Sequence, residues 1–556
     1  MVRIVPGVSA RAVDGLLRRL RGMPKPRNKI FVERGLRTPT RDGFALLSDL
    51  YGPAEPGDGG ATILIRTPYG RGAPLDALWG RTLAAQGYHV LLQSCRGTAG
   101  STDTFQPMVR EAADAQDTVV WLREQPWFNG SLGTMGMSYL AYTEWALLMD
   151  PPPELQASVM IAGPHDFSSS IWDSGAFALE TYLGWSDANS VAFEDRPSAL
   201  RQLAGRKRAN RLKSAYASLP LAEAASAVLG ARAPWYREWL DHPDPAEPYW
   251  RDYDFADALE RVRTPTLLVG GWYDVFLRQT VVQYETLRSR GIDVALTLGP
   301  WTHGGHVLKG SGVIDNEALQ WFDTYLGTQA SPRRTDPVRT FVTGSRRTWQ
   351  SAQSWPPAST EISWFVHEGG RLESAAATGG SSTFCFNPAD PTPAVGGRRL
   401  ASGAGVVDNA KLEARSDVLT FTSAALTNDV EFEGAPMAEV TVSVDNPNAD
   451  LFVRVCEVDT KGRSRNICDG FVRLDPAVPA GEIQDLAVRL LPCAHRVQKG
   501  HSLRLQLSGG AHPLYARNLG TGELAPTGAS LKTSVHTIHH ATTRLVLPVT
   551  TPARLR

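Results

Sequence analysis

The sequence predicts a mixed α/β domain that is interrupted by a helical insertion and followed by a β-sandwich. In residues 44–160 strand-like and helix-like segments alternate, which is typical of a sheet with mostly parallel strands. Residues 165–262 are helix-rich, contain many Trp, Tyr and Arg, and show no clear strand pattern. From about residue 335, short Val-, Thr- and Leu-rich runs are separated by Gly, Pro, Asn and Asp, as in sandwiches and jelly rolls.

The elements of the α/β body are expected in the following order. Strands are expected at Phe44–Leu50, Ala61–Arg66, His89–Gln93 and Ser131–Met135, and helices at Asp76–Gln86, Glu111–Gln125 and Tyr139–Leu148. The alternation resumes with strands Thr266–Gly270 and Ala295–Leu298 on either side of a helix at Val281–Arg290. We therefore expect the body to comprise residues 30–164 and 263–335. Residues 165–262, inserted between two sheet strands, would form a cap over the mouth of the site.

The remaining residues, 336–556, are expected to form the sandwich. Its clearest strand candidates are Val440–Val444, Leu451–Cys456, Ile483–Leu490, Ser502–Leu507 and Thr543–Leu547. Asn387–Gly405 is rich in Gly and Pro and should be a long loop. A separate sandwich is consistent with the length, because 556 residues are too many for one hydrophobic core.

Composition excludes several classes of function. Lys plus Arg and Asp plus Glu both number 57, so a net charge of zero predicts neither a nucleic-acid partner nor a membrane partner. The basic segment Arg11–Arg21 is expected to be a solvated surface helix. The sequence shows no apolar run long enough to span a bilayer and no secretory leader, and its five cysteines lack CxxC spacing. We expect reduced thiols, a cytoplasmic chain, and no metal or cofactor; a homodimer stays open.

Ser138 is the first candidate catalytic residue. It follows Gly136 and Met137 at the junction between a predicted strand and a predicted helix. A sharp turn there needs small neighbours, and it projects a hydroxyl toward the positive end of the helix dipole. The same position also suits a serine that caps the helix, so the residue alone leaves both interpretations open.

A serine nucleophile needs a base, and the base needs an orienting acid. Asp274 ends the segment Leu267–Asp274, and His303 ends the segment Leu296–His303. Both follow predicted strands, where ligands bind in such sheets, and the order Ser, Asp, His is that of α/β-hydrolases. Each alone would be more ordinary as a helix cap or a solvated side chain, but the ordered set favours catalysis. His306 is a second candidate for the base.

The oxyanion of a tetrahedral intermediate needs two donors. The backbone N–H of Tyr139 follows the nucleophile and would supply one. The hydroxyl of Tyr69, in the loop Arg66–Gly70 after an early strand, would supply the other. The alternative for Tyr69 is an ordinary surface aromatic.

These motifs resemble the CocE/NonD hydrolases, a family of esterases, acylases and X-Pro dipeptidyl-peptidases. The resemblance is carried by Thr67–Tyr69, Gly136–Tyr139, Gly271–Asp274 and Gly299–His303, and it extends from about residue 30 to the C-terminus. It is supported in the sandwich by Ala449–Cys456 and Asp469–Arg473. The family implies an α/β-hydrolase body, a helical cap and a C-terminal jelly roll.

By position, the resemblance implies that Ser138 is the nucleophile, His303 the base and Asp274 the orienting acid. It also implies a tyrosine hydroxyl, here Tyr69, beside the Tyr139 N–H in the oxyanion hole. Aromatic side chains that line the acyl pocket in relatives correspond to Trp172, Trp185 and Phe276, although the two tryptophans are closer together in this sequence.

The sequence departs from the family at two positions. Ala141 stands where Gly is usual, and Ser94 replaces the family's aspartate in Gln93–Gly97. We expect the second change to alter loop packing and leave the chemistry unchanged. No pair of carboxylates that would bind a substrate amino group is evident, which weakens the aminopeptidase and amino-acid-ester alternatives.

The sequence therefore predicts a metal-independent serine hydrolase that acts on small-molecule carboxylic esters or amides. An X-Pro dipeptidyl-peptidase or a β-lactam acylase is the alternative within the enzyme class. A binding protein that kept the hydrolase fold is the alternative outside it.

Overall fold

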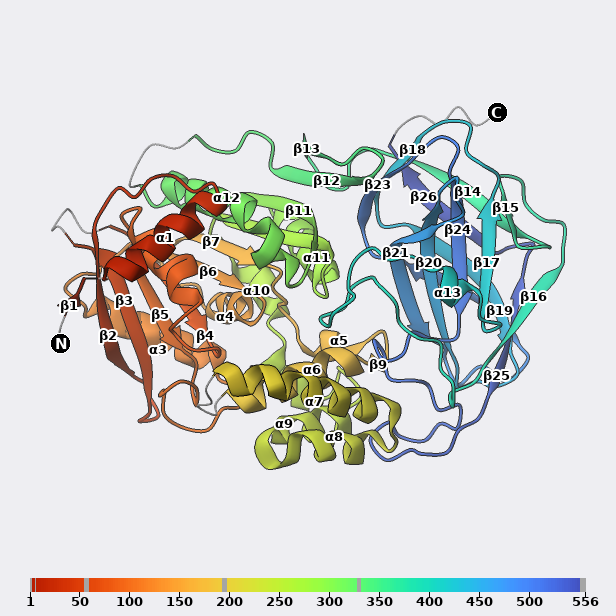
Figure 1. Ribbon diagram of the computed structural model, residues 1–556, viewed down its shortest axis with the longest axis horizontal. Coiled ribbons are helices and arrows are strands. Elements are labelled where there is room, and N and C mark those ends of the chain that lie inside the picture. The colour runs from red at the N-terminus through yellow and green to blue at the C-terminus, as the bar shows by residue number, and fades with distance from the viewer. Residues whose placement is uncertain (1–2, 6, 55–59, 193–197, 328–331, 551–556) are drawn as a thin grey trace. The chain divides into compact units, whose positions relative to one another are not determined.

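The computed structural model in Figure 1 describes residues 3–5, 7–54, 60–192, 198–327 and 332–550. The chain divides into two compact units. Unit 1 comprises Met1–Ser168, Pro248–Gly271 and Gln279–Val338, and unit 2 comprises Ser169–Glu247, Trp272–Arg278 and Arg339–Arg556. The helix-rich insertion thus falls in one unit with the sandwich. The finer division into body, cap and sandwich stays a prediction.

Unit 1 is built on a mixed sheet in the order β1-β2-β3-β5-β4-β6-β7-β10. β1 to β3 pair antiparallel, and from β5 to β10 all pairs are parallel. β11 lies beside β10, because the N–H of Thr266 donates to the carbonyl of Asp293 over 3.0 Å. The strands are β1 Arg3–Ile4, β2 Ile30–Pro39, β3 Ala45–Pro53, β4 Thr62–Thr67, β5 His89–Ser94, β6 Leu132–Met137, β7 Leu155–Ile161, β10 Thr266–Tyr273 and β11 Val294–Thr302.

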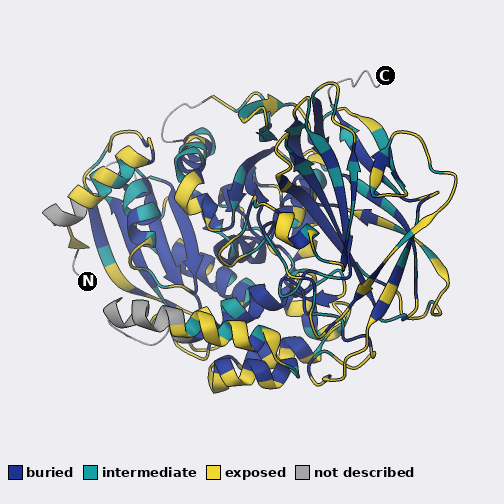
Figure 2. Ribbon diagram, turned by 45° about the vertical axis from the view of Figure 1, so that its right-hand side comes forward, coloured by how far each residue is buried: buried dark blue, intermediate teal, exposed yellow. Residues whose placement is uncertain are grey.

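The parallel strands are buried on both faces, which explains why they read as continuous apolar runs in the sequence (Figure 2). The α/β fold predicted from the alternation of elements is therefore confirmed. The helices of this part are α1 Val8–Leu20, α2 Arg81–Ala84, α3 Glu111–Arg123, α4 Tyr139–Leu147, α10 Ala256–Arg261, α11 Leu277–Ser289 and α12 Ser311–Tyr325, with shorter turns η1 Asp76–Gly80, η3 Pro248–Tyr253 and η4 His306–Gly310.

Two local expectations need correction. The helix expected over Asp76–Gln86 consists of the π-turn η1 followed by α2. Gly80 lies at their junction, where an added Cβ would meet the ring of Tyr51 at 3.2 Å. The insertion, whose sequence shows no clear strand pattern, contains an antiparallel pair, β8 Trp172–Asp173 and β9 Ala176–Phe177. Two-residue strands are too short to show an alternating pattern.

Unit 2 contains the helices of the insertion and a predominantly antiparallel β-sandwich. The helices are α5 Ser168–Ile171, which begins in unit 1, α6 Leu179–Ala192, α7 Ser198–Ala217, α8 Leu221–Leu229, η2 Gly230–Arg232 and α9 Pro234–Asp241. The strands are β12 Val338–Gly344, β13 Thr348–Ala352, β14 Thr360–His367, β15 Arg371–Glu373, β16 Ser381–Phe386, β17 Val418–Ser423, β18 Val430–Gly434, β19 Met437–Val444, β20 Asp450–Val458, β21 Ser464–Arg473, β22 Ile483–Arg489, β23 Cys493–Val497, β24 Ser502–Ser508, β25 Ser534–His539 and β26 Arg544–Val549, with the short helix α13 Ala410–Glu413.

The insertion and the sandwich share a core within unit 2. Ala176 of β9 packs with Phe452, Phe471 and Tyr515. Ion pairs flank this cluster: Arg398 binds Asp173, and Arg399 binds Glu180. The strand-poor loop expected at Asn387–Gly405 is confirmed, since it holds only isolated bridges. Across the described part of the chain, every helix is too short or too polar to cross a bilayer.

Candidate active site

Ser138 occupies a strained turn between β6 and α4. Its backbone has φ 60° and ψ −125°, an arrangement that is rare for a residue other than glycine and costs about 1–3 kcal/mol. The turn is tight because an added Cβ on Gly136 would lie 2.3 Å from the carbonyl carbon of Leu140. The N–H of Ser138 donates to the carbonyl of Ile161 over 2.9 Å, which ties the turn to β7.

The Ser138 side chain makes no hydrogen bond that caps α4. The helix-cap interpretation left open by the sequence is therefore wrong. The hydroxyl stands at the positive end of α4, where a developing negative charge is stabilised. Strain of this kind persists where surrounding structure enforces it, and such positions cluster at active sites.

Ala141, the residue larger than the family's usual glycine, is accommodated by a glycine opposite it. A Cβ on Gly163 would lie 2.3 Å from the Cβ of Ala141. Gly163 lies in the loop after β7. Because it has no side chain, it leaves room for the methyl group of Ala141 on α4.

The hydroxyl of Tyr139 is hydrogen-bonded to two residues, Met108 and Glu111, that the sequence analysis did not identify. The hydroxyl accepts from the N–H of Met108 over 2.6 Å and donates to Glu111 over 2.9 Å. Burial, followed by the Glu111 charge, raises the pKa of this hydroxyl well above its ordinary value, so it stays protonated. Tyr139 is therefore fixed through its backbone, which begins α4, and through its side-chain hydroxyl, so the position of its backbone N–H is well defined.

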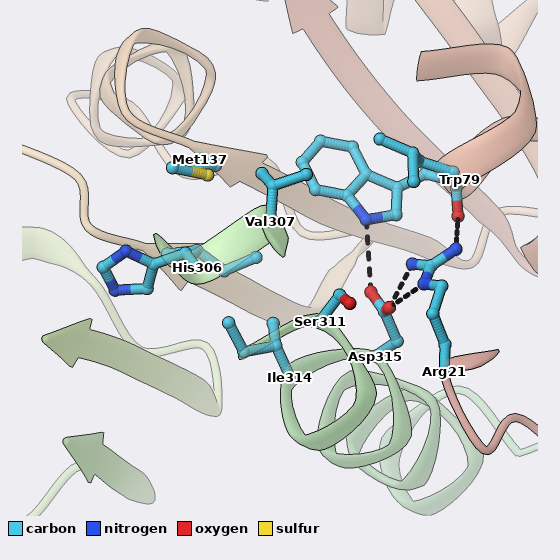
Figure 3. A pocket seen from close by; sticks show the side chains of 10 residues that line it. Arg21, Trp79, Met137, His306, Val307, Ser311, Ile314 and Asp315 are labelled. Carbon is cyan, nitrogen blue, oxygen red and sulfur yellow. Dashed lines mark hydrogen bonds and ion pairs between the residues drawn. The ribbon is translucent and has the colours of Figure 1, made fainter. Parts of the chain in front are cut away.

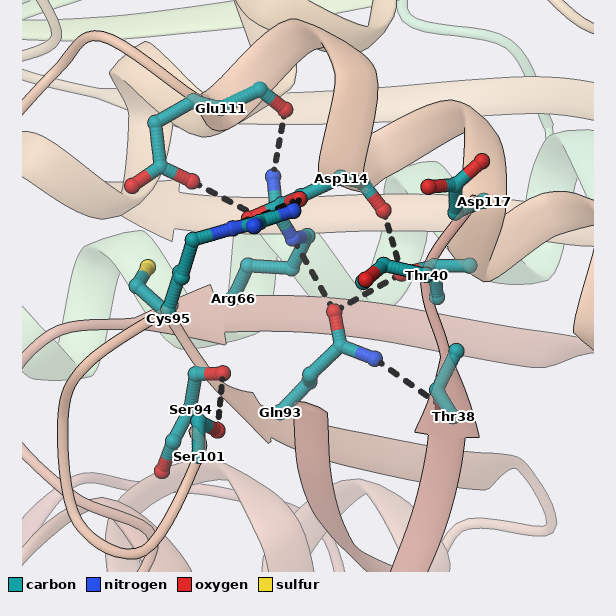
Figure 4. Close-up of polar contacts among 12 residues, drawn as sticks. Thr38, Thr40, Arg66, Gln93, Ser94, Cys95, Ser101, Glu111, Asp114 and Asp117 are labelled. Carbon is teal, nitrogen blue, oxygen red and sulfur yellow. Dashed lines mark hydrogen bonds and ion pairs between the residues drawn. The ribbon is translucent and has the colours of Figure 1, made fainter. Parts of the chain in front are cut away.

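Glu111 belongs to a buried network of charged side chains (Figure 4). Arg66 at the end of β4 pairs with Glu111 at 2.9 Å and donates to Gln93 over 3.0 Å. Arg96 forms a short ion pair with Asp114, one turn after Glu111 on α3. Buried charges are tolerated only when paired and hydrogen-bonded, so this network fixes α3 and, through Glu111, the Tyr139 ring.

Ser94, which replaces the family's aspartate, lies in the same region (Figure 4). Its hydroxyl accepts from Arg71 over 2.6 Å, and its carbonyl accepts from Ser101 over 2.9 Å. Arg71 also approaches Asp49 of β3 at 3.3 Å. Ser94 itself is the last residue of β5 and pairs with Thr67 of β4, and its contacts with Arg71 and Ser101 join the end of the strand to the loop that follows. That the change leaves the chemistry unaltered stays a prediction.

Tyr69 is 44% exposed, and its ring stands edge-on to that of Tyr139 with centroids 6.4 Å apart. Its N–H donates to the Thr67 hydroxyl over 3.0 Å, which shapes the turn after β4. The structure thus brings the two predicted oxyanion-hole residues together.

Asp274 and His303 follow β10 and β11 directly, at the same end of the sheet as Ser138. Asp274 is fully buried and accepts from the N–H of Phe276 over 2.7 Å. The close approach of the two strands requires glycine at position 271, where a Cβ would lie 2.4 Å from the carbonyl oxygen of Trp301. The roles of Asp274 as orienting acid and of His303 as base stay predictions.

His306, the second candidate for the base, is buried. Its Nδ1 lies 3.1 Å from the carbonyl oxygen of His303, which requires Nδ1 to carry the proton. It lines a cavity of about 20 Å³, together with Met137 (Figure 3). This position suits a residue that holds the His303 loop.

The three aromatic residues predicted for an acyl pocket all lie in unit 2. Trp172 is buried and donates from Nε1 to the carbonyl of Trp239 over 2.9 Å. Trp185 packs on Trp239 with ring centroids 6.1 Å apart, and Phe276 is buried. Trp172 also lines a pocket of about 60 Å³ between the insertion and the sandwich. Their contact with substrate stays a prediction. In the described residues, no group of three His, Cys, Asp or Glu side chains is arranged to hold a metal.

Comparison with known proteins agrees with this architecture. Residues 42–305 match the family model for X-Pro dipeptidyl-peptidase (S15 family), and residues 331–546 match that for the X-Pro dipeptidyl-peptidase C-terminal non-catalytic domain. Cocaine esterase of Rhodococcus sp. (strain MB1 Bresler) is 29% identical over 93% of this chain and 98% of its own.

Two solved structures share the fold. An aminopeptidase from a marine sediment Thaumarchaeota archaeon aligns with a TM-score of 0.79 at 20% identity, covering 95% of this chain and 98% of that one. An α-amino acid ester hydrolase aligns with a TM-score of 0.77 at 20% identity and the same coverage. The α/β-hydrolase type of fold with a C-terminal β-rich domain, predicted from the sequence, is confirmed.

Proposed function

We propose that this chain, which matches the S15-family model over residues 42–305 and resembles an esterase along most of its length, cleaves carboxylic esters of small molecules through an acyl-enzyme on Ser138. The observation that carries the proposal is the strained turn at Ser138, whose hydroxyl is not engaged in capping α4. The esterase named among the relatives supports an ester substrate.

In the proposed reaction, His303 takes the proton of the Ser138 hydroxyl as its oxygen attacks the substrate carbonyl. Asp274 orients His303 and stabilises its cationic form. The tetrahedral oxyanion accepts hydrogen bonds from the Tyr69 hydroxyl and the Tyr139 N–H. Collapse breaks the ester C–O bond, and the alcohol leaves with the proton from His303. Water, activated by His303, then attacks the acyl-enzyme and releases the acid.

The X-Pro dipeptidyl-peptidase is the second candidate, favoured by the name of the matching family. Parallel initial rates on p-nitrophenyl butyrate and Ala-Pro-p-nitroanilide distinguish the two, with Ser138→Ala as the control. Cleavage of the ester alone, abolished by Ser138→Ala, supports the esterase. A higher kcat/KM on the anilide would establish the peptidase and imply an acid that binds the substrate amine.

The oxyanion hole is tested separately. Removing one donor should lower kcat by roughly 10²–10³, so Tyr69→Phe is expected to lose that much on the ester. A variant within about threefold of the parent would remove Tyr69 from the proposal. A fluorophosphonate that fails to label Ser138 in the folded protein would favour a non-catalytic binding protein.

A further inference from the structure

The N-terminal segment differs in charge from the rest of the chain. Residues 1–29 contain six Arg, two Lys and one acid, Asp14, which gives a net charge of +7. Since the whole chain has a net charge of zero, the remaining residues carry −7. The zero total, from which we expected no membrane partner, therefore conceals a local excess of positive charge.

The helix α1 turns its polar side toward the protein. Asp14 accepts from Arg81 over 3.0 Å, and Arg18 donates to the carbonyl of Met23. Arg21, just past the helix end, is buried in an ion pair with Asp315 of α12 (Figure 3). Residues 14, 18 and 21 succeed one another on one face of a helix, and these contacts fix that face inward.

The large apolar side chains on another face of α1 are exposed to solvent. Val13, Leu16 and Leu20 are 49%, 59% and 75% exposed, and they follow the spacing of one helical stripe. Beside the helix, Ile4 and Val5 are also more than half exposed. The three side chains on α1 form an apolar helical face, unlike the scattered single residues that soluble surfaces tolerate.

Exposed cations lie on α1 and in the segment that follows it. Arg19 on α1, and Lys25 and Lys29 after it, are exposed, whereas Arg21 and Arg27 are occupied by Asp315 and Asp323. Amphipathic helices that bind anionic membranes have the same composition. Their apolar face enters the headgroup region, and their Arg and Lys side chains bind lipid phosphates.

We propose that α1 docks the protein, side-on, to an anionic membrane surface. Val13, Leu16 and Leu20 would enter the headgroup boundary, and Arg19, Lys25 and Lys29 would bind lipid phosphates. The inward ion pairs at Asp14 and Arg21 hold the helix on the body so that its apolar side remains presented. Charge complementarity selects anionic lipid over neutral lipid as the occupant.

The test uses the full chain and co-sedimentation with phosphatidylcholine vesicles, with and without phosphatidylglycerol. Binding is expected only with phosphatidylglycerol, and it should weaken as salt is raised. Leu16→Glu/Leu20→Glu should weaken binding about tenfold or more, because it removes the apolar anchor and adds repelling charge. Ile483→Glu/Leu524→Glu is the matched control, since these side chains are 62% and 65% exposed elsewhere, and it should bind like the parent.

All four substituted side chains are exposed, so unfolding temperature should change little in either variant. Equal binding to both vesicle types, or undiminished binding by Leu16→Glu/Leu20→Glu, would overturn the proposal. So would a parent that binds no vesicles but forms a dimer, detected by light scattering, which the α1 variant converts to monomer. In that case the face would be an interface between copies of the chain.

Discussion

Replacing Gly163 by Ala should disturb the turn that carries Ser138. The new Cβ would lie 2.3 Å from the Cβ of Ala141, whereas carbon atoms in ordinary contact are roughly 3.5–4.0 Å apart. Neither side can move freely, because Ser138 is hydrogen-bonded to Ile161 and Ala162 donates to Val269 over 2.7 Å. Overpacking of this kind costs about 1–3 kcal/mol.

The second substitution, Ala141→Gly, should relieve this clash. By itself it places glycine in α4, which costs about 1 kcal/mol. The double variant Gly163→Ala/Ala141→Gly should therefore lose only about 1 kcal/mol of unfolding free energy, the cost of the glycine in α4. Gly163→Ala alone should lose more, up to about 3 kcal/mol, because it retains the clash. The measurement is the free energy of unfolding from urea titrations, with kcat on an ester substrate recorded for each variant.

Gly379→Ala serves as the control, because no atom lies within 4 Å of its added Cβ, and it should stay within about 0.5 kcal/mol of the parent. The reasoning is refuted if the effects of the two substitutions add to within about 0.5 kcal/mol, since independent sites behave in that way.

Three further substitutions test particular contacts. Burial raises the pKa of the Glu144 carboxyl well above its ordinary value. Its contribution to stability is therefore full below the unfolded-state pKa, about 4.3, and is lost progressively as pH rises from there through the folded-state pKa, so the unfolding free energy of Glu144→Gln should rise relative to that of the parent over that interval. Asp173→Asn leaves Arg398 without its carboxylate and should lower the unfolding free energy by about 3–5 kcal/mol, seen as a lower urea midpoint at unchanged slope. His306→Leu removes the hydrogen bond to the His303 carbonyl, worth about 1 kcal/mol, and should lower kcat roughly fivefold with KM unchanged.

The position of Ser138 could be predicted from the sequence because a sharp turn imposes local requirements. Gly136 is needed for the close approach to Leu140, and small residues beside a serine between a strand and a helix are visible in one sequence. Asp274 and His303 were predicted from the same logic, since the ends of parallel strands meet at one edge of a sheet.

Glu111 could not be predicted in this way. It precedes Tyr139 by 28 residues, and a glutamate at the start of an expected helix is ordinarily a solvated residue near the helix N-terminus. Only the packing of α3 against α4 shows that it receives the Tyr139 hydroxyl. The orientation of α1 was equally hidden, because an amphipathic pattern distinguishes two faces of a helix and does not reveal which one turns inward.

The contacts of Ser94 give a physical reason to expect that this departure from the family leaves the chemistry unchanged. Arg71, which contacts Ser94, is only partly exposed, so its charge is stabilised by a nearby carboxylate. If the family's aspartate were its sole source of negative charge, Arg71 would lose that stabilisation here. Asp49 lies on the adjacent strand β3 and approaches Arg71 at 3.3 Å, while the Ser94 hydroxyl accepts a second hydrogen bond from the same guanidinium. The negative charge is thus supplied one strand away. Arg96, two residues after Ser94, keeps its own partners Asp114 and Asp42, so the network that supports Tyr139 does not depend on position 94.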